Sequence, residues 1–205
     1  MRAYYEAELK ISEEALRSCL KCPKEGPAVY VACLAAYNSG TLHGQWVDLS
    51  EVSELSFDED GMVAALQQCI DLVLSESPEP GAEEWAIHDS QGLPKVLAGE
   101  NPDLSELAAF TRQWELACEG SDDDAFRVWC DHIGEVQTYE DFREAYRGSW
   151  DSEADFACEF YEQQGVELGP LASYIDWDQV WYGQFSCDGW WSEYAGDGVY
   201  WVFAP

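Results

Sequence analysis

The chain has 205 residues and a formal net charge of -31, because 41 acidic side chains face only 10 lysines and arginines. So small a basic complement leads us to expect no direct binding to the phosphates of a nucleic acid. The 10 tryptophans and 11 tyrosines provide large apolar surfaces, so we expect a folded protein with an aromatic core rather than a disordered chain.

The first 26 residues differ in charge from the rest of the chain. They carry half of all the basic residues: Arg2, Lys10, Arg17, Lys21 and Lys24. Tyr5, Leu9 and Leu16 fall near one face of a helix that would end at Pro23. We therefore expect residues 1–26 to be an N-terminal extension that is either helical or loosely ordered.

The pattern of residues 27–92 predicts a small α+β domain. Short apolar runs rich in β-forming residues predict three strands, at 28–34, 41–48 and 84–89. The turn signal Tyr37-Asn38-Ser39-Gly40 between the first two strands predicts a hairpin. Apolar residues recur with a helical period over residues 62–74, so we expect a helix there.

Helical patterns dominate residues 93–138. Pro102-Asp103 opens one predicted helix that ends before Gly120, and Ser121 begins a second that ends at Gly134. We interpret this segment as a central helical domain.

The remaining residues, 139–205, predict a C-terminal α+β domain, which we expect to carry the dimer contact. Two pairs resemble helix capping devices, namely Thr138 with Asp141 and Ser152 with Asp155. The first of these helices is expected to include Tyr146. The aromatic segment 171–185 is expected to be helical, and the segment 199–203 to be a short strand. The predicted fold class is therefore α+β, with three small domains and an acidic surface.

The acidity itself suggests a kind of partner. Duplex DNA carries about one negative charge per 1.7 Å of its axis, so a net charge of -31 matches that of about 15 base pairs. Such a surface repels nucleic acid and attracts a basic surface, of which nucleic-acid-binding grooves are the commonest kind. No apolar run is long enough to span a membrane and no signal peptide is apparent, so we expect a cytoplasmic protein with reduced cysteines.

Carboxylates near predicted helices are the candidate partner-binding groups. They are Asp58, Glu59, Asp60, Glu83, Glu84, Glu115, Glu119, Asp122, Asp123, Asp124, Asp151, Glu153, Asp155, Glu159 and Glu162. Three of them, Asp155, Glu159 and Glu162, share one helix face and raise the alternative of acid–base catalysis, but a solvated helix face is the favoured interpretation.

Metal binding and cofactor binding are not expected. The run Asp122-Asp123-Asp124 lacks the spacing of a calcium loop, and acids at a helix N-terminus are the simpler account. Cys19 and Cys22 have the spacing of half a zinc site, but no second pair accompanies them.

Aromatic residues gather near the end of the chain and leave two interpretations open. The residues concerned are Trp177, Trp181, Tyr182, Trp190 and Trp191. They form either a small aromatic core or a protein–protein surface, and the second interpretation makes them candidate dimer contacts.

Several separated segments carry motifs of one family pattern. The segment AVYVACLAAYNSGTLHGQWVDL (28–49) contains a Tyr-Asn-x-Gly turn followed by a Gly-x-Trp-hydrophobic-Asp strand, and in this it resembles the N-terminus of the ArdA antirestriction family. The segments PEPGAEEWAIHDSQGLP (78–94) and FREAYRGSWDSEADFACEFYEQQG (142–165) are similar to later blocks of the family pattern. Residues 1–26 have no counterpart in it.

The resemblance implies an elongated, acidic, three-domain homodimer that mimics DNA. Proteins of this family are encoded on plasmids, transposons and phages and act in the bacterial cytoplasm. They occupy the DNA-binding groove of type I restriction-modification enzymes, on the methyltransferase and specificity core, and block DNA binding, cleavage and modification without catalysis. Two alternatives are a DNA mimic directed at another defence complex, such as a CRISPR effector, and, more remotely, a carboxylate-based hydrolase.

The few basic residues beyond the extension carry a further expectation. They are Lys95, Arg112, Arg127, Arg143 and Arg147. If the outer face of the protein is to remain negative, these side chains should turn inward or toward neighbouring carboxylates.

Overall fold

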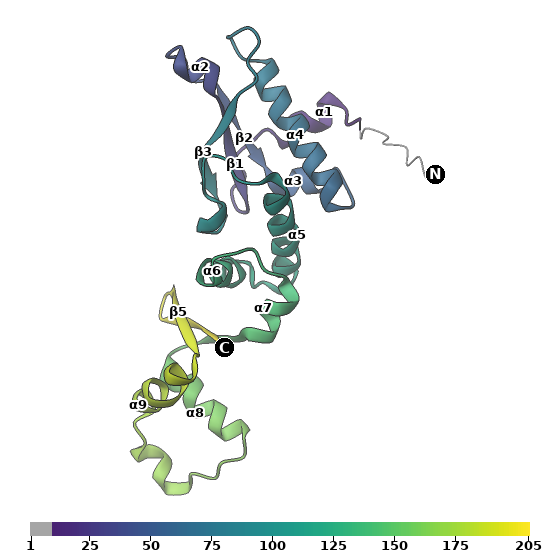
Figure 1. Cartoon of the computed structure of the whole chain (residues 1–205). Helices are drawn as coiled ribbons and strands as arrows, with labels where there is room; N and C mark the ends of the chain where they lie inside the picture. Colours follow the sequence, from purple (N-terminus) through teal and green to yellow (C-terminus); the bar gives the residue numbers. More distant parts are fainter. Residues whose placement is uncertain (1–9) are drawn as a thin grey trace, which may run out of the picture. The chain divides into compact units, whose positions relative to one another are not determined.

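The computed structural model describes residues 10–205, and the chain divides into two compact units at Gln137 and Thr138. We call residues up to 137 unit 1 and residues 138–205 unit 2. Each unit combines helices with a three-stranded antiparallel sheet (Figure 1), which confirms the predicted α+β class. The finer division at residues 92 and 138 into three domains stays a prediction.

The sheet of unit 1 has its most apolar strand at its centre. Its strands are β1 (Ala28–Cys33), β2 (Gly44–Asp48) and β3 (Trp85–Gln91), in the order β2-β1-β3. Both pairings of β1 are antiparallel, with Val29 opposite Val47 on one side and opposite Ser90 on the other. Five of the six β1 residues are buried, as the uninterrupted apolar run predicts for a central strand.

The connection between β1 and β2 differs from the predicted tight turn. The two strands pair as expected, but a short helix, α2 (Leu34–Asn38), joins them, so both strands are shorter than predicted. The alanines at 35 and 36 favour a helix, which ends where Gly40 adopts a positive φ of 81°. Strand β2 then starts at Gly44, where a Cβ would lie 2.5 Å from the Val31 carbonyl oxygen.

Helices cover this sheet and continue beyond it. In chain order they are α3 (Leu49–Ser53), α4 (Glu59–Ser75), the short η1 (Lys95–Leu97), α5 (Leu104–Gly120) and α6 (Asp123–Ile133). Helix α4 packs against β1 and β2, and α5 packs against α3, α4 and α6. The buried residues Leu66 and Ile70 lie on α4, and Phe110 of α5 stacks on Phe126 of α6 at a centroid distance of 5.9 Å. The three long helices were predicted within three residues of their observed limits.

The N-terminal extension contributes a helix to unit 1. Helix α1 (Glu13–Cys19) packs against α3 and α4 and buries Leu16 and Cys19 (Figure 1). Arg17 forms an ion pair with Glu76, and Lys21 forms one with Glu51. Two basic side chains of the extension are therefore paired with acids farther along the chain. The predicted helix positions Tyr5 and Leu9 lie outside the described residues.

Unit 2 is built from a second sheet and a series of short helices. Its strands are β4 (Tyr146–Trp150), β5 (Trp191–Gly196) and β6 (Val199–Phe203), in the order β4-β6-β5. Its helices are α7 (Tyr139–Ala145), α8 (Glu153–Gln163), η2 (Gly169–Tyr174), α9 (Trp177–Val180), η3 (Trp181–Phe185) and η4 (Ser186–Asp188). The capping pairs are confirmed, because Thr138 accepts from the Asp141 N–H and Ser152 accepts from the Asp155 N–H.

The structure of unit 2 departs from the sequence expectations at two strands, and it refines the form of one helical segment. Tyr146 begins β4 instead of ending a helix, and β5 was not predicted at all. Strand β4 depends on pairing with β6, which lies about 50 residues away, and no local pattern reveals that pairing. Strand β5 forms a hairpin with β6 around Asp197-Gly198, both at positive φ, and this Asp-Gly turn signal was missed in the sequence. The segment 171–185 is helical, but as successive short helices rather than one.

The core of unit 2 is aromatic. Phe156 is buried on α8 and contacts the rings of Trp150, Trp181, Phe185 and Trp190 at centroid distances between 5.2 and 5.9 Å. Most of these pairs meet edge to face, an arrangement that aromatic rings prefer. The expectation of an aromatic core is therefore confirmed for this unit.

Asp48 is a buried carboxylate that organises the end of the first sheet. It ends β2, is 4% exposed, and caps α3 by accepting hydrogen bonds from the backbone N–H groups of Ser50 and Glu51 at 3.2 and 3.3 Å. Burial raises the pKa of the Asp48 carboxyl, and the two backbone hydrogen bonds offset this only in part. The folded state therefore binds the Asp48 proton more tightly than the unfolded state does.

This asymmetry gives a prediction for Asp48. Its contribution to stability is present below the unfolded pKa of about 3.9 and is lost as the pH rises through the higher folded pKa. Asp48→Asn keeps the capping oxygen and removes the charge. At pH 7 the free energy of unfolding of this variant, measured in urea, should therefore be at least as large as that of the wild type. Asp48→Ala should be about 1 kcal/mol less stable than Asp48→Asn. Equal stability of the two variants at pH 7 would contradict the capping role.

Candidate partner-binding surface

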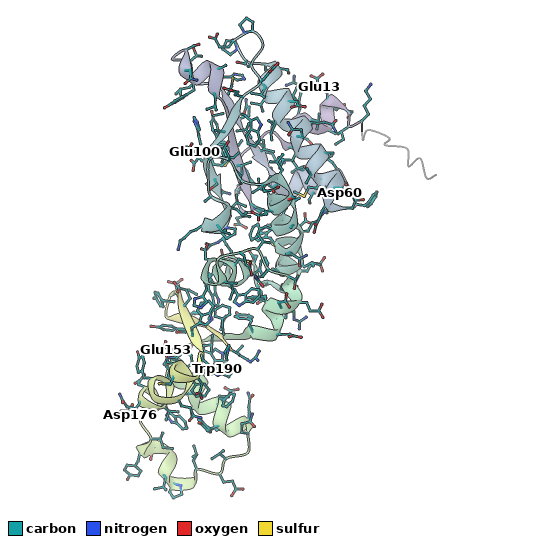
Figure 2. All side chains as sticks on the ribbon, viewed as in Figure 1. Glu13, Asp60, Glu100, Glu153, Asp176 and Trp190 are labelled. Carbon is teal, nitrogen blue, oxygen red and sulfur yellow. The ribbon has the colours of Figure 1, made fainter. Side chains whose placement is uncertain are left out.

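Most of the predicted carboxylates lie on the surface, as Figure 2 shows for the labelled Asp60 on unit 1. The exposed ones are Asp58, Glu59, Asp60, Glu83, Glu84, Glu119, Asp124, Asp151, Asp155, Glu159 and Glu162. The half-buried ones are Glu115, Asp122, Asp123 and Glu153. Exposure makes the first group available to a partner, while their role as contacts stays a prediction.

Helix N-termini position many of these acids. Asp58 caps α4 by accepting from the Gly61 N–H at 2.8 Å, and Glu59 and Asp60 follow in the first turn. Asp123 and Asp124 occupy the first turn of α6. The positive end of a helix dipole stabilises a carboxylate there, so these acids need no neighbouring lysine.

A subset of the candidates is already engaged within the protein. Glu115 accepts from Ser53 and Arg112, Glu153 accepts from the Ser192 hydroxyl, and Asp155 accepts from the Ser152 hydroxyl. In the part of the chain that the structure describes, seven candidates make no hydrogen bond or ion pair through their side chains: Glu59, Asp60, Glu83, Glu84, Glu119, Asp123 and Asp151. Among the candidates, these seven have no partner within the described residues that an external cation would have to displace.

Three of the five basic residues expected to turn inward bind groups of the protein itself. Arg127 pairs with Asp124 and Asp131 at 3.6 and 3.8 Å. Arg147 donates to the Glu144 carbonyl and lies 5.8 Å from the centroid of the Trp190 ring. Arg112 is described below. The expectation was wrong for Arg147, which is exposed and binds backbone carbonyls and an aromatic ring rather than a carboxylate. It was also wrong for Lys95 and Arg143, which are exposed and make no ion pair within residues 10–205.

The aromatic candidates near the C-terminus divide between the core and the surface. Trp181 is 1% exposed, so its side chain fills the core of unit 2 and is not available as a dimer contact on the surface of the folded unit. Trp177 and Trp190 pack against the same core. The ring of Trp191 stacks on that of Phe203 with a distance of 4.0 Å between the ring centroids. Tyr182 is 58% exposed and is the one of the five that presents most of its ring to solvent.

Two short motifs raised the question of a metal site: Cys19 with Cys22, and the run Asp122-Asp123-Asp124. Across residues 10–205, no group of three or more His, Cys, Asp or Glu side chains could hold a metal ion. Cys22 is exposed whereas Cys19 is buried and donates its thiol to the Ala15 carbonyl, so the two cysteines do not face one site. The helices in the described part of the chain include none that is long and apolar enough to cross a membrane.

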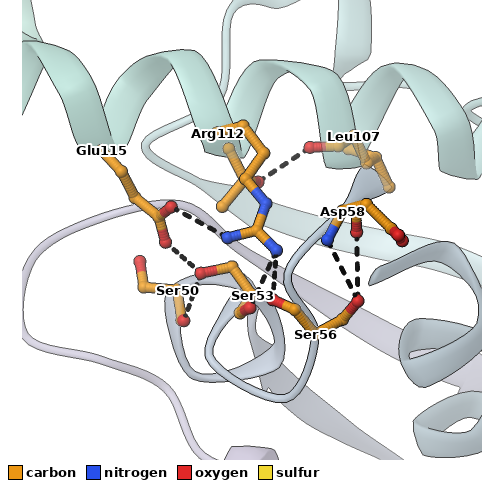
Figure 3. Close-up of polar contacts among 8 residues, drawn as sticks. Ser50, Ser53, Ser56, Asp58, Leu107, Arg112 and Glu115 are labelled. Atoms are coloured by element: carbon orange, nitrogen blue, oxygen red, sulfur yellow. Dashed lines mark hydrogen bonds and ion pairs between the residues drawn. The ribbon is translucent and has the colours of Figure 1, made fainter. Parts of the chain in front are cut away.

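Arg112 holds together a cluster that the sequence did not reveal (Figure 3). From α5 its guanidinium donates to the carbonyls of Ser53 and Ser56 at 3.0 and 2.6 Å. It also contacts Glu115 at 3.5 Å, and Glu115 accepts a hydrogen bond from the Ser53 hydroxyl. Arg112 therefore supplies a charged donor to the carbonyls at the end of α3 and just beyond it, and caps that helix across more than 50 residues of sequence.

A comparison with known families connects this geometry to a function. The family model for the antirestriction protein ArdA matches residues 29–185, which is most of the chain. The chain belongs to the ArdA antirestriction family. A search of curated proteins found no match. The ArdA segment begins in β1 and ends in η3, so α1, β5 and β6 lie outside it.

The ArdA-like motif in the first sheet has a structural explanation. Gly44 allows β2 to approach β1 closely, and Asp48 is the buried cap of α3. Trp46 packs edge to face with Tyr30 across the strand pair at 5.7 Å. These motif residues therefore hold the sheet and its first helix, whereas the exposed carboxylates lie outside the motif.

The Arg112 cluster gives a stability prediction. Arg112→Ala leaves two carbonyls without their charged donor, so we expect the free energy of unfolding to fall by about 2 kcal/mol. Arg112→Lys should lose an intermediate amount, because one ammonium group reaches fewer acceptors. The matched control is Glu115→Gln, which removes the half-exposed ion pair and should cost less than about 1 kcal/mol. Urea unfolding would measure all three, and a neutral Arg112→Ala would contradict the capping role.

Proposed function

We propose that this protein inhibits restriction by mimicking DNA. Its exposed carboxylates stand in for phosphates, and it occupies the DNA-binding groove of a type I restriction-modification enzyme in the bacterial cytoplasm. The observation that carries the proposal is the set of seven exposed or half-exposed carboxylates without internal partners among the described residues, in a chain of the ArdA antirestriction family. An antirestriction protein must keep DNA and restriction enzyme apart, and occupation of the DNA groove achieves this without catalysis.

The distribution of charge supports this mechanism. No lysine or arginine occurs between Glu25 and Pro94, and none follows Arg147. The stability of an isolated domain favours mixed surface charges, because like charges repel one another in the compact state. A surface that omits the counter-charges is explained by a partner that supplies them. Lysines and arginines of a DNA-binding groove are such a set of charges.

The physical consequences are fast association and strong dependence on salt. Complementary charges steer two proteins together, and the attraction weakens as ions screen it. Charge alone would make the protein bind any basic groove, so the spacing of the carboxylates must supply the selectivity. We further propose a homodimer formed through unit 2, in which Tyr182 is available and the buried Trp181 supports the fold from inside.

The proposal predicts displacement of DNA. A purified type I enzyme bound to a labelled duplex should release it as the protein is added, at near-stoichiometric ratios in low salt. In the absence of DNA, raising the salt concentration from about 50 to about 200 mM should weaken direct binding of the protein to the enzyme at least tenfold, because ions screen the attraction between the opposite charges. Persistence of the enzyme–DNA complex at every excess of the protein would reject the proposal. Displacement from a CRISPR effector alone would favour that target instead.

Neutralisation of single carboxylates should weaken inhibition gradually. We expect Glu59→Gln, Asp60→Asn, Glu83→Gln and Glu84→Gln to raise the inhibitory concentration by less than about fivefold each, and by more when combined. The matched controls are Glu14→Gln and Glu25→Gln, which are exposed, remove the same charge and lie outside the ArdA segment. These should change inhibition less. Complete loss of activity on neutralising one of Asp155, Glu159 or Glu162 would instead indicate a catalytic carboxylate.

A further inference from the structure

One large apolar side chain of unit 1 is fully exposed. Phe57 lies in the loop between α3 and α4, and its relative solvent-accessible surface is 107%, so the whole residue is exposed. Among the described large apolar residues, Leu42 comes next at 86%. A phenylalanine in this position contributes almost nothing to the stability of the core, because none of its surface is removed from water.

The loop that carries Phe57 is held on both sides. Arg112 binds the carbonyls of Ser53 and Ser56, the residue that precedes Phe57. On the other side, the Asp58 backbone N–H donates to the Ser56 hydroxyl at 3.3 Å, and Asp58 caps α4. Figure 3 shows the bonds of Arg112 to Ser53 and Ser56 and the bond of Asp58 to Ser56. The backbone on both sides of Phe57 is therefore fixed, which lowers the entropy that a partner must remove on binding.

This arrangement has a cost that the fold does not require. The Arg112 Nε atom is buried and has no hydrogen-bond partner in residues 10–205. A buried donor without an acceptor destabilises the folded state. The ring of Phe57 is in water in the folded and unfolded states alike, so it leaves stability unchanged, and a partner that covers it gains the free energy of removing its apolar surface from water.

The surroundings of Phe57 specify the partner's chemistry. The neighbouring residues Glu54, Asp58, Glu59 and Asp60 are all exposed acids. A complementary site is a flat apolar pocket with lysines or arginines at its rim. Enzymes that modify DNA bases have such a pocket in a basic groove, because they receive an extruded base there while they bind its phosphates.

We propose that Phe57 is the aromatic anchor of the partner contact, inserted into a flat pocket rimmed by basic residues in the DNA-binding groove. The ring takes the place of an extruded base, and the acids beside it take the place of the flanking phosphates. This inference rests on the proposed function and adds to it one residue on which affinity should depend sharply, unlike any single carboxylate. Arg112 acts as a positioning residue for that anchor.

The test compares variants of Phe57 in the same DNA-displacement assay. Phe57→Ala should raise the inhibitory concentration roughly 30-fold, as expected for an interface hot spot, whereas Phe57→Tyr should stay within about threefold of wild type. The matched control is Leu42→Ala, which removes a comparably exposed apolar side chain from another loop of unit 1 and should change inhibition less than about twofold. Arg112→Lys should weaken inhibition by a larger factor when Phe57 is present than in the Phe57→Ala background.

A second measurement locates the ring directly. A photoreactive benzoylphenylalanine at position 57 should cross-link to the type I enzyme within its DNA-binding groove, and excess duplex should suppress the cross-link. A cross-link outside that groove would overturn the inference. The inference would also be overturned if Phe57→Ala inhibited as well as the wild type or lost thermal stability. A change of oligomeric state in Phe57→Ala would overturn it as well, because that result would place a second copy of the chain on Phe57.

The outcomes separate this inference from the proposed function. Failure of the wild-type protein to displace DNA rejects DNA mimicry. Displacement that is equally strong with wild type and Phe57→Ala retains mimicry and rejects the anchor alone.

Discussion

Mutual repulsion among 41 carboxylates is the constraint to which the rest of this structure responds. The chain cannot rely on surface ion pairs, since only 10 lysines and arginines are present. It uses helix N-termini instead, where Asp58 and Asp103 accept backbone hydrogen bonds and the helix dipole favours a negative charge. The hydrogen bonds from the Ser105 hydroxyl and backbone N–H lower the pKa of the Asp103 carboxyl, so this cap remains charged.

The sequence predicted the parts of the fold that local patterns determine. The capping serine at 152 and threonine at 138, and the apolar period of α4, marked helices that the structure confirms. Strand β4 escaped prediction because Tyr146 becomes a strand residue only through pairing with the distant β6, and such tertiary pairing overrides the preferences of the strand's own residues. Strand β5 could have been found, because the Asp197-Gly198 turn that joins it to β6 is a local hairpin signal.

The candidate surface was predictable to a similar extent. Acids beside helix starts, such as Glu59 and Asp60, were expected at the surface and lie there. The Arg112 cluster was not, because its acceptors on Ser53 and Ser56 are backbone carbonyls, which carry no signal in the side-chain sequence. Trp181 and Tyr182 are neighbours in the chain, and only their packing shows that the first is buried and the second exposed.

The docking of α1 has a consequence for the order in which unit 1 assembles. Leu16 and Cys19 are buried against helices whose residues, 49–53 and 59–75, follow them in the chain. During synthesis on the ribosome the N-terminus emerges first, so Leu16 and Cys19 cannot be buried until the residues of α4 have been made. The helix is therefore a late element of the fold, and α3 and α4 form the surface against which it packs.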